Sequence, residues 1–273
     1  MGLFGSGENS EDLMYHAMSL MEKGQPKGAI TLFSKVIKKD PKNTSALFNK
    51  GLALNQIKKY SDAVTCFDLV LQINPADSQA FNNKGIALAE MGNTQAANEC
   101  YDQAIKVDPK NSASYFNKGV LLDRLQEHEE AIEFLDKAIT ADPKKINAMF
   151  YKGIVLGKLN RHEEALNCFE GVCKKNPTHL DSLFHKGIEL AEIGNHEKAI
   201  EIFDQILSKH KDNINIIYAK SRSKAAIGDY NESMSLLRKA ITSNGKEIRE
   251  WAKNEKIFEK FHDDEQFRKL VKL

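Results

Sequence analysis

The chain repeats a 34-residue pattern, and this period constrains its fold more than any other feature of the sequence. The segment SALFNKGLAL at residues 45–54 returns as ASYFNKGVLL at residues 113–122, and no insertion interrupts the register. Three residue types recur in this register: Gly51, Gly85, Gly119, Gly153 and Gly187; Ala29, Ala63, Ala97, Ala131, Ala165 and Ala199; and Pro41, Pro75, Pro109, Pro143 and Pro177. A period of about 20–50 residues predicts an array of stacked supersecondary units.

Seven repeats result when the register is extended in both directions: residues 10–43, 44–77, 78–111, 112–145, 146–179, 180–213 and 214–247. Counted from the first residue of each repeat, the small residue stands at position 8, alanine at position 20 and proline at position 32. Ala17 and Ser221 occupy position 8 in the first and last repeats. Residues 1–9 are expected to be a disordered lead-in.

Each repeat has the pattern of two helices. Leu47, Gly51 and Leu54 are spaced as one face of a first helix, and Ala63 and Phe67 as the inner face of a second. Residues that tolerate a positive φ recur between the helices at position 15, namely Gly24, Gly92, Asn160, Gly194 and Gly228. One helical hairpin cannot bury its apolar face alone, so the sequence predicts an all-α solenoid of stacked hairpins.

The segment after the seventh repeat is predicted to close the array. Residues 248–273 are expected to form a capping helix, over 248–261, and a short terminal helix with Asp263 or Asp264 as its N-cap. Glu255 stands at position 8 of this segment, where a charged side chain prevents close stacking of a further unit. We expect the side chains of Trp251, Phe258 and Phe267 to shield the apolar flank of the seventh repeat.

These residues at this period resemble the tetratricopeptide repeat (TPR) family, which has a small residue at position 8, Ala at 20, an aromatic residue or Leu at 24, and Pro at 32. The resemblance implies a right-handed superhelix of helix-turn-helix hairpins. It also implies that the first helices line the concave face and the second helices the convex face. It does not imply a particular ligand.

Composition excludes several classes of protein. The formal net charge of +1 lacks the basic excess of a typical nucleic-acid-binding domain, so a nucleic-acid partner is the least favoured hypothesis. No apolar run approaches the length of a membrane-spanning helix, and no secretory signal pattern is expected at the start. Four cysteines without metal-ligand spacing indicate a reducing compartment, and we expect a cytoplasmic protein without membrane attachment.

No catalytic set is found in the sequence, so we expect neither an enzyme nor a cofactor. His128-Glu129-Glu130 and its repeat at His162 resemble half of an HExxH zinc motif, but the second histidine is missing. Packing at the turn between the helices is therefore favoured over metal ligation for these histidines. Cys66, Cys100 and Cys168 share one position of the second helix, as expected for small apolar core residues, and Cys173 lies further along the same helix as Cys168.

The concave face that the resemblance implies is the expected binding site. Positions 5 and 9 lie one helical turn apart and are mostly apolar, so that they form successive pairs such as Phe48 with Leu52. The residues expected to contact a partner are Phe48, Leu52, Asn82, Ile86, Phe116, Val120, Arg124, Phe150, Ile154, Phe184, Ile188 and Tyr218. Packing between neighbouring first helices is the competing interpretation for the aromatic side chains.

The predicted partner is a protein segment with an apolar or amphipathic surface. Relatives that hold heat-shock-protein tails use a clamp with Lys at positions 2 and 5, and this chain has no Lys at either position. The lysines at position 7 could attract an acidic partner, but packing of their aliphatic stems, with the ammonium in water or near an acid, is favoured. We therefore expect a non-catalytic scaffold that binds a peptide or helix; the alternative is a self-associating assembly element.

The first six residues, MGLFGS, match the short pattern for N-myristoylation at Gly2. So short a match arises often by chance. An unmodified lead-in is therefore the favoured interpretation.

Overall fold

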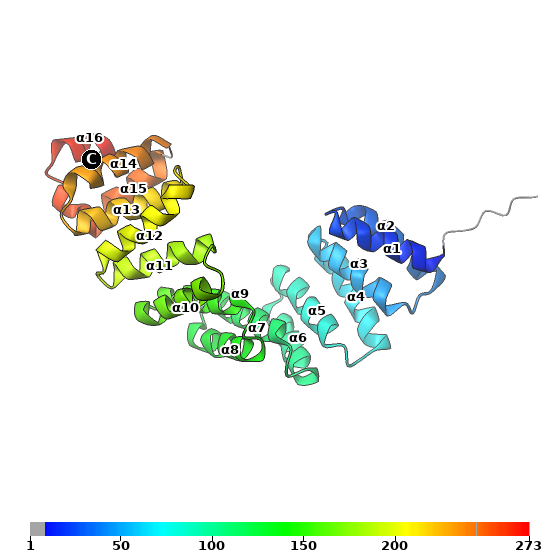
Figure 1. Cartoon of the computed structure of the whole chain (residues 1–273). Coiled ribbons are helices and arrows are strands. Elements are labelled where there is room, and N and C mark those ends of the chain that lie inside the picture. Colours follow the sequence, from blue (N-terminus) through cyan, green and yellow to red (C-terminus); the bar gives the residue numbers. More distant parts are fainter. Residues whose placement is uncertain (1–8, 244, 273) are drawn as a thin grey trace, which may run out of the picture. The chain divides into compact units, whose positions relative to one another are not determined.

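The computed structural model describes residues 9–243 and 245–272, and all of its regular elements in this part of the chain are helical. Residues 1–8, which make up most of the expected lead-in, lie outside the described part. The chain divides into two compact units, an N-terminal unit of residues 1–144 and a C-terminal unit of residues 145–273. Each unit is a stack of helical hairpins (Figure 1).

The N-terminal unit contains four hairpins in chain order. Their helices are α1 (Ser10–Glu22), α2 (Pro26–Lys39), α3 (Thr44–Gln56), α4 (Tyr60–Ile73), α5 (Ser78–Glu90), α6 (Thr94–Val107), α7 (Ser112–Arg124) and α8 (His128–Ala141). Each helix packs against the next along the chain, and α3 and α5 also contact the first helices that follow them, α5 and α7. The first helices therefore form one layer and the second helices another.

The C-terminal unit contains three further hairpins and a terminal segment. The hairpin helices are α9 (Ile146–Lys158), α10 (His162–Lys175), α11 (Leu180–Glu192), α12 (His196–Lys209), α13 (Ile214–Ala226) and α14 (Tyr230–Ser243). The terminal elements are α15 (Gly245–Asn254), the 3-10 helix η1 (Lys256–Phe261) and α16 (Glu265–Val271). One continuous helix was expected over residues 248–261, but Glu255 has an extended backbone with ψ 117° and separates α15 from η1.

Local side-chain bonds explain where the hairpins begin and end. Asp40, before Pro41, accepts a hydrogen bond from the backbone N–H of Lys42 at 3.1 Å, which forms a turn after α2. Asn43 then accepts one from the backbone N–H of Ala46 at 2.9 Å and caps the start of α3. The same cap position holds Asp77, Asn111, His179 and Asn213 before later first helices.

Position 15 adopts the left-handed conformation in every one of the seven hairpins. Glycine serves at four of them, as at Gly92 with φ +81°, and Asn160 has φ +57°. Lys58 and Gln126 also have positive φ values, of 61° and 67°, although their side chains disfavour this conformation. The turn geometry is thus a property of the hairpin, which imposes it on residues that do not favour it.

The small residue at position 8 lies where the two helices of a hairpin cross. A Cβ atom added at Gly187 would lie 2.5 Å from the ring of Phe203, and one added at Gly119 would lie 2.9 Å from Cγ of Leu135. Phe203 and Leu135 occupy position 24 and are fully buried. A larger residue at position 8 would therefore overpack the core of its own hairpin.

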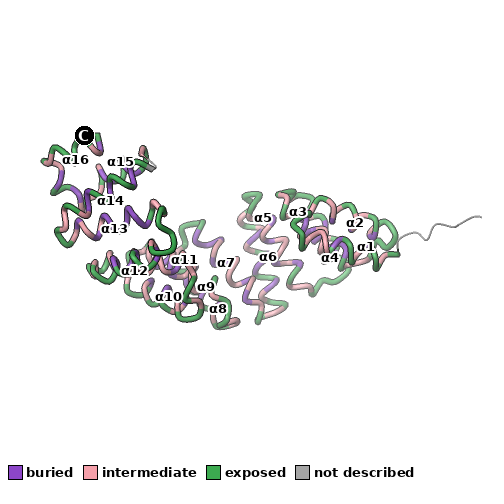
Figure 2. Tube along the Cα trace, turned by 45° about the horizontal axis from the view of Figure 1, so that its top comes forward, coloured by how far each residue is buried: buried purple, intermediate pink, exposed green. Residues whose placement is uncertain are grey.

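The core of each unit lies between successive helices, where buried and exposed positions alternate along each helix (Figure 2). The terminal segment adds its own cluster to the C-terminal unit. Phe258 and Phe267 are fully buried there, together with Leu237 and Ile241 of α14. Trp251, expected to shield the seventh repeat with them, contacts the ring of Tyr218 of α13 but remains 46% exposed.

Candidate functional site

The candidate contact residues lie on the first helices, and most are half-buried. In the N-terminal unit, Phe48 and Leu52 pack their inner surfaces against the cluster around Phe67, and Ile86 packs against the cluster around Tyr101. The half-buried residues of the candidate site are Phe48, Leu52, Ile86, Phe116, Val120, Phe150, Ile154, Phe184 and Ile188. Each unit therefore retains part of an apolar surface on its layer of first helices, which we call the first-helix face.

The aromatic side chains at position 5 are oriented by the core beneath them. The ring of Phe48 meets the ring of Phe67 edge-on, with centroids 5.7 Å apart and planes at 65°. Phe150 and Phe169 repeat this arrangement with the same distance and angle. Packing against the second helix of the same hairpin thus orients these rings, whereas the competing interpretation had named neighbouring first helices. The two side chains stay half-buried.

In the C-terminal unit a histidine joins the aromatic side chains of this face. His185 stacks on Phe169 with ring centroids 5.2 Å apart, and its ring meets those of Phe150 and Phe184 at 5.7 and 5.5 Å. Burial lowers the pKa of His185, although Asp181 opposes the shift. The neutral imidazole is therefore favoured, as suits a side chain surrounded by apolar rings.

The first-helix face of the C-terminal unit ends at a polar cluster. Arg222 replaces the apolar residue of position 9 and pairs with Glu192 at 3.1 Å and with Glu255 at 3.2 Å. Tyr218 is only 7% exposed, and its ring contacts that of Trp251 with centroids 5.7 Å apart. Tyr218 therefore offers a partner little surface.

Two further candidate residues have polar roles in the N-terminal unit. Asn82 is 6% exposed and accepts a hydrogen bond from the side-chain amide of Asn117 at 2.9 Å. Arg124 is exposed and forms a 2.9 Å ion pair with Glu90, which occupies the same position in the preceding repeat. Asn82 thus joins neighbouring first helices, whereas Arg124 lies at the edge of the apolar surface.

The lysines at position 7 form a ladder of ion pairs between hairpins. Four of them pair with the carboxylate at position 25 of the preceding repeat: Lys84 with Asp68 at 2.6 Å, Lys118 with Asp102 at 2.5 Å, Lys186 with Glu170 at 3.0 Å, and Lys220 with Asp204 at 2.7 Å. The ladder favours the structural interpretation of these lysines. Because the carboxylates also recur every 34 residues, the sequence contained the signal for this pairing.

Two of the turn histidines bind buried carboxylates. His128 Nδ1 lies 2.9 Å from Asp123, which is 2% exposed, and His162 Nδ1 lies 2.8 Å from Glu189, which is 5% exposed. Burial raises the pKa of Glu189, and the hydrogen bond from His162 limits the rise. Each pair joins the start of a second helix to a first helix.

No three His, Cys, Asp or Glu side chains gather into a metal-binding group within residues 9–243 and 245–272. Burial raises the pKa of the Cys66 and Cys100 thiols, which disfavours the reactive thiolate. Over the same described residues, no helix is both long and apolar enough to cross a membrane.

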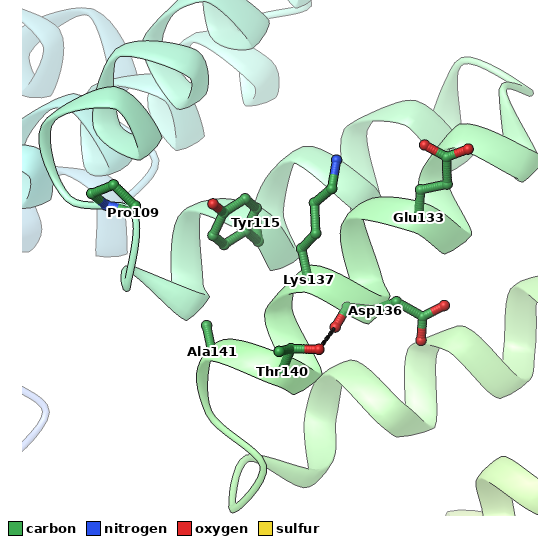
Figure 3. Close-up of a pocket in the computed structure, with 7 residues that line it drawn as sticks. All are labelled: Pro109, Tyr115, Glu133, Asp136, Lys137, Thr140 and Ala141. Atoms are coloured by element: carbon green, nitrogen blue, oxygen red, sulfur yellow. Dashed lines mark hydrogen bonds between the residues drawn. The ribbon is translucent and has the colours of Figure 1, made fainter.

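A surface pocket of about 500 Å³ lies on the N-terminal unit, away from the candidate contact residues. In Figure 3, Tyr115 of α7 lies between Pro109, in the turn before α7, and Lys137, which is on α8. Thr140 donates a 2.8 Å hydrogen bond to the backbone carbonyl oxygen of Asp136. Lys137 also lies over the ring of Phe134, 4.4 Å from its centroid. The lining combines one aromatic ring with charges of both signs, and it indicates no particular reaction.

Family models for tetratricopeptide repeats match most of the chain. The model of the Psidin N-terminal TPR repeats region matches residues 15–118, and two tetratricopeptide repeat models match residues 112–145 and 152–214. The match to residues 112–145 coincides with the fourth repeat of the register read from the sequence. No curated protein matches the chain.

Solved structures of repeat proteins share the fold. A structure of MamA is 26% identical, covers 59% of this chain and 94% of its own, and has a TM-score of 0.52. YrrB, described as a TPR protein with an unusual peptide-binding site, is 22% identical with coverages of 69% and 97% and a TM-score of 0.55. PilW, a type IV pilus biogenesis factor, is 20% identical with coverages of 74% and 94% and a TM-score of 0.67. With its hairpins, its 34-residue register and these matches, the chain belongs to the tetratricopeptide repeat family.

Proposed function

We propose that this protein is a non-catalytic scaffold that binds an apolar or amphipathic peptide segment of a partner on its first-helix face. The fold and the neighbouring structures support a protein-interaction scaffold, and repeat proteins of this family generally lack catalysis. The finer proposal is supported by the residue pairs at positions 5 and 9, such as Phe48 with Leu52 and Phe150 with Ile154. In each of these pairs an aromatic ring packs edge-on against the core, and a half-buried aliphatic side chain follows one turn later. These pairs leave apolar surface that hairpin packing does not cover.

The C-terminal unit offers the best-defined pairs. Phe150 on α9 and Phe184 on α11 both contact the ring of His185. The half-buried Ile154 and Ile188 follow them one helical turn later. Neutral His185 adds an apolar ring surface to this region, and Arg222 closes it with a paired charge. A peptide with two apolar side chains at helical spacing fits this chemistry, because such anchors fill adjacent apolar positions.

The experiment is a selection of peptides from a displayed library on the intact chain, followed by affinity measurements on the selected sequences. Ile154→Ser with Ile188→Ser should weaken binding at least about tenfold, since each buried aliphatic side chain contributes about 1.5–3 kcal/mol. Circular dichroism and a urea transition would establish that the double variant still folds.

A matched control lies in the same unit. Ile193 and Ile227, at position 14, are 40% and 44% exposed and lie at the turns between first and second helices. Ile193→Ser with Ile227→Ser makes the same chemical change away from the proposed surface and should leave affinity unchanged. The proposal fails if the library yields no binder, or if binding depends on the control pair instead.

A further inference from the structure

The charges of the chain are unevenly distributed, although its net charge is close to zero. Residues 23–59 contain nine lysines and one acidic residue, Asp40, while the rest of the chain has 30 basic and 37 acidic residues. Residues 123–136 show the opposite bias, with six acidic residues and one basic residue, Arg124. Both segments belong to the N-terminal unit, in its first two hairpins and its fourth hairpin.

Equivalent second helices carry these opposite charges. Helix α2 contains no acidic residue, and its exposed lysines, with that of the following turn, are Lys27, Lys35, Lys38, Lys39 and Lys42; we call them the basic face. Helix α8 exposes Glu129, Glu130, Glu133 and Asp136, which we call the acidic face, and one basic residue, Lys137. Because both helices have 14 residues in the same repeat register, their charges cover surfaces of similar length.

The first hairpin also interrupts the ladder of ion pairs. Position 25 is acidic in five successive repeats, at Asp68, Asp102, Asp136, Glu170 and Asp204, but is Ser34 in the first. Lys50 of α3 is the ladder lysine of the next repeat, so the repeat before it lacks the carboxylate that the other ladder positions have. The recurring carboxylate of position 25 is therefore missing where α2 meets α3.

Interaction with the helix dipoles explains only part of the charge distribution on α2 and α8. Lys38 and Lys39 in the last turn of α2, and Glu129 and Glu130 in the first turn of α8, do stabilise their own helices. Lys27 lies in the first turn of α2, where a positive charge opposes the dipole. Concentrated charge of one sign attracts a surface of opposite charge and steers its approach.

We propose that the basic face on α2 is a docking surface for a second copy of this chain, which presents the acidic face of its α8. The charge complementarity of equivalent helices carries this assignment. Because the two faces are different surfaces, the contact is heterologous and leaves one face free on each copy, so association extends to short chains of molecules. This interface lies on second helices and does not depend on peptide binding by the first-helix face.

The test measures the molar mass of the intact chain by light scattering across a range of protein concentrations. Association should be present in about 0.02 M salt and lost in about 0.5 M salt, since screening shortens the range of exposed charges. Lys38→Glu with Lys42→Glu, and separately Glu130→Lys with Glu133→Lys, should each lower the association constant at least tenfold. An equimolar mixture of the two reversed variants should restore association as a mixed complex.

The third repeat supplies a matched control. Lys106 and Lys110 are exposed at the same repeat positions as Lys38 and Lys42, so Lys106→Glu with Lys110→Glu adds the same charge elsewhere and should leave association unchanged. The proposal is overturned if the chain is monomeric in low salt, if the mixture does not recover, or if this control weakens association equally. It is also overturned if the basic face instead binds vesicles containing phosphatidylserine as a monomer. The Ile154→Ser and Ile188→Ser variant should associate normally, which separates this proposal from peptide binding.

Discussion

The ammonium nitrogen of Lys118 lies 2.5 Å from Oδ1 of Asp102, which is on the second helix of the preceding hairpin. The lysine side chain is only 8% exposed, whereas the aspartate side chain is 49% exposed. Its ammonium also lies 4.5 Å from the centroid of the Phe134 ring. The ammonium group of Lys118, on the first helix α7, therefore contacts the second helices on both sides: α6 through Asp102 and α8 through Phe134.

Asp102→Asn should destabilise the protein by about 1 kcal/mol, because the nearly buried ammonium of Lys118 keeps an acceptor but loses its counter-charge. The half-exposed position of Asp102 limits the loss through solvent screening. A urea transition followed by circular dichroism would measure the change in unfolding free energy.

The reverse change is available in the first hairpin. Ser34→Asp would place a carboxylate at the position that pairs with Lys50 and should stabilise the protein by a few tenths to about 1 kcal/mol. If Ser34→Asp had no effect while Asp102→Asn proved neutral as well, the ladder would make no contribution to stability.

Gly119→Ala should lower the unfolding free energy by about 1 kcal/mol or more, although alanine favours helices. Its Cβ would lie 2.9 Å from Cγ of Leu135 and 3.1 Å from the carbonyl oxygen of Ala131, and the backbone oxygen cannot move aside. Gly119→Leu should cost more. The melting temperature and the urea midpoint would report both changes.

Gly28→Ala is the control for this substitution. A Cβ at Gly28 meets the end of the Leu20 side chain, 3.0 Å from Cδ1, which can rotate. This change should therefore be neutral or slightly stabilising. Equal losses at Gly28 and Gly119 would show that helix packing at position 8 is not the cause.

Gln126→Gly should raise the unfolding free energy by about 0.5–1 kcal/mol, because Gln126 has a φ of 67° that glycine adopts without strain. The matched reverse change is Gly92→Ala, at a φ of 81° in the neighbouring hairpin, which should destabilise by a similar amount. Thermal unfolding of both variants would measure the pair. A loss of stability in Gln126→Gly would contradict the assignment of strain to this residue.

Acidification should destabilise the C-terminal unit through His185. Burial holds the pKa of His185 below its ordinary value of about 6.5, so the folded chain binds this proton less tightly than the unfolded chain. Stability is therefore complete above about pH 6.5 and falls as the pH decreases from there towards the folded pKa. Burial lowers the pKa of His196 as well, which adds to the same trend.

His185→Gln should flatten this dependence, measured as the unfolding free energy between about pH 7.5 and pH 5. His210→Gln, at an exposed residue after α12, is the control and should leave the slope unchanged. A slope that is the same in the His185 variant and in the unmodified chain would exclude this histidine as the source.

Phe258→Ala should destabilise the protein by about 3–5 kcal/mol, because it leaves a cavity in the cluster that covers the seventh hairpin. Trp251→Ala should have an effect about half as large or less, since that side chain is 46% exposed. Thermal unfolding would compare the two. The capping role predicted for the terminal segment would be contradicted by a neutral Phe258 variant.

Most of the helical architecture could be predicted from the sequence, because its signals are local. Asn43 caps a helix through a backbone N–H three residues away, and the missing Cβ of Gly119 leaves room for Leu135 of its own hairpin. A period of 34 residues repeats these signals, so that each hairpin confirms the register of the next. The apolar pairs of the candidate site were also visible, since positions 5 and 9 lie on one helix face.

Tertiary structure decided how much of each side chain is available. Trp251 and Phe258 lie on the same terminal segment, yet one is half exposed and the other fully buried, because the chain leaves the helical path at Glu255. Asn82 and Tyr218 fit the sequence pattern of a binding surface but are covered by neighbouring side chains. Periodicity gives the face on which a residue lies, whereas its exposure and ionic partners depend on which residues from other helices pack beside it.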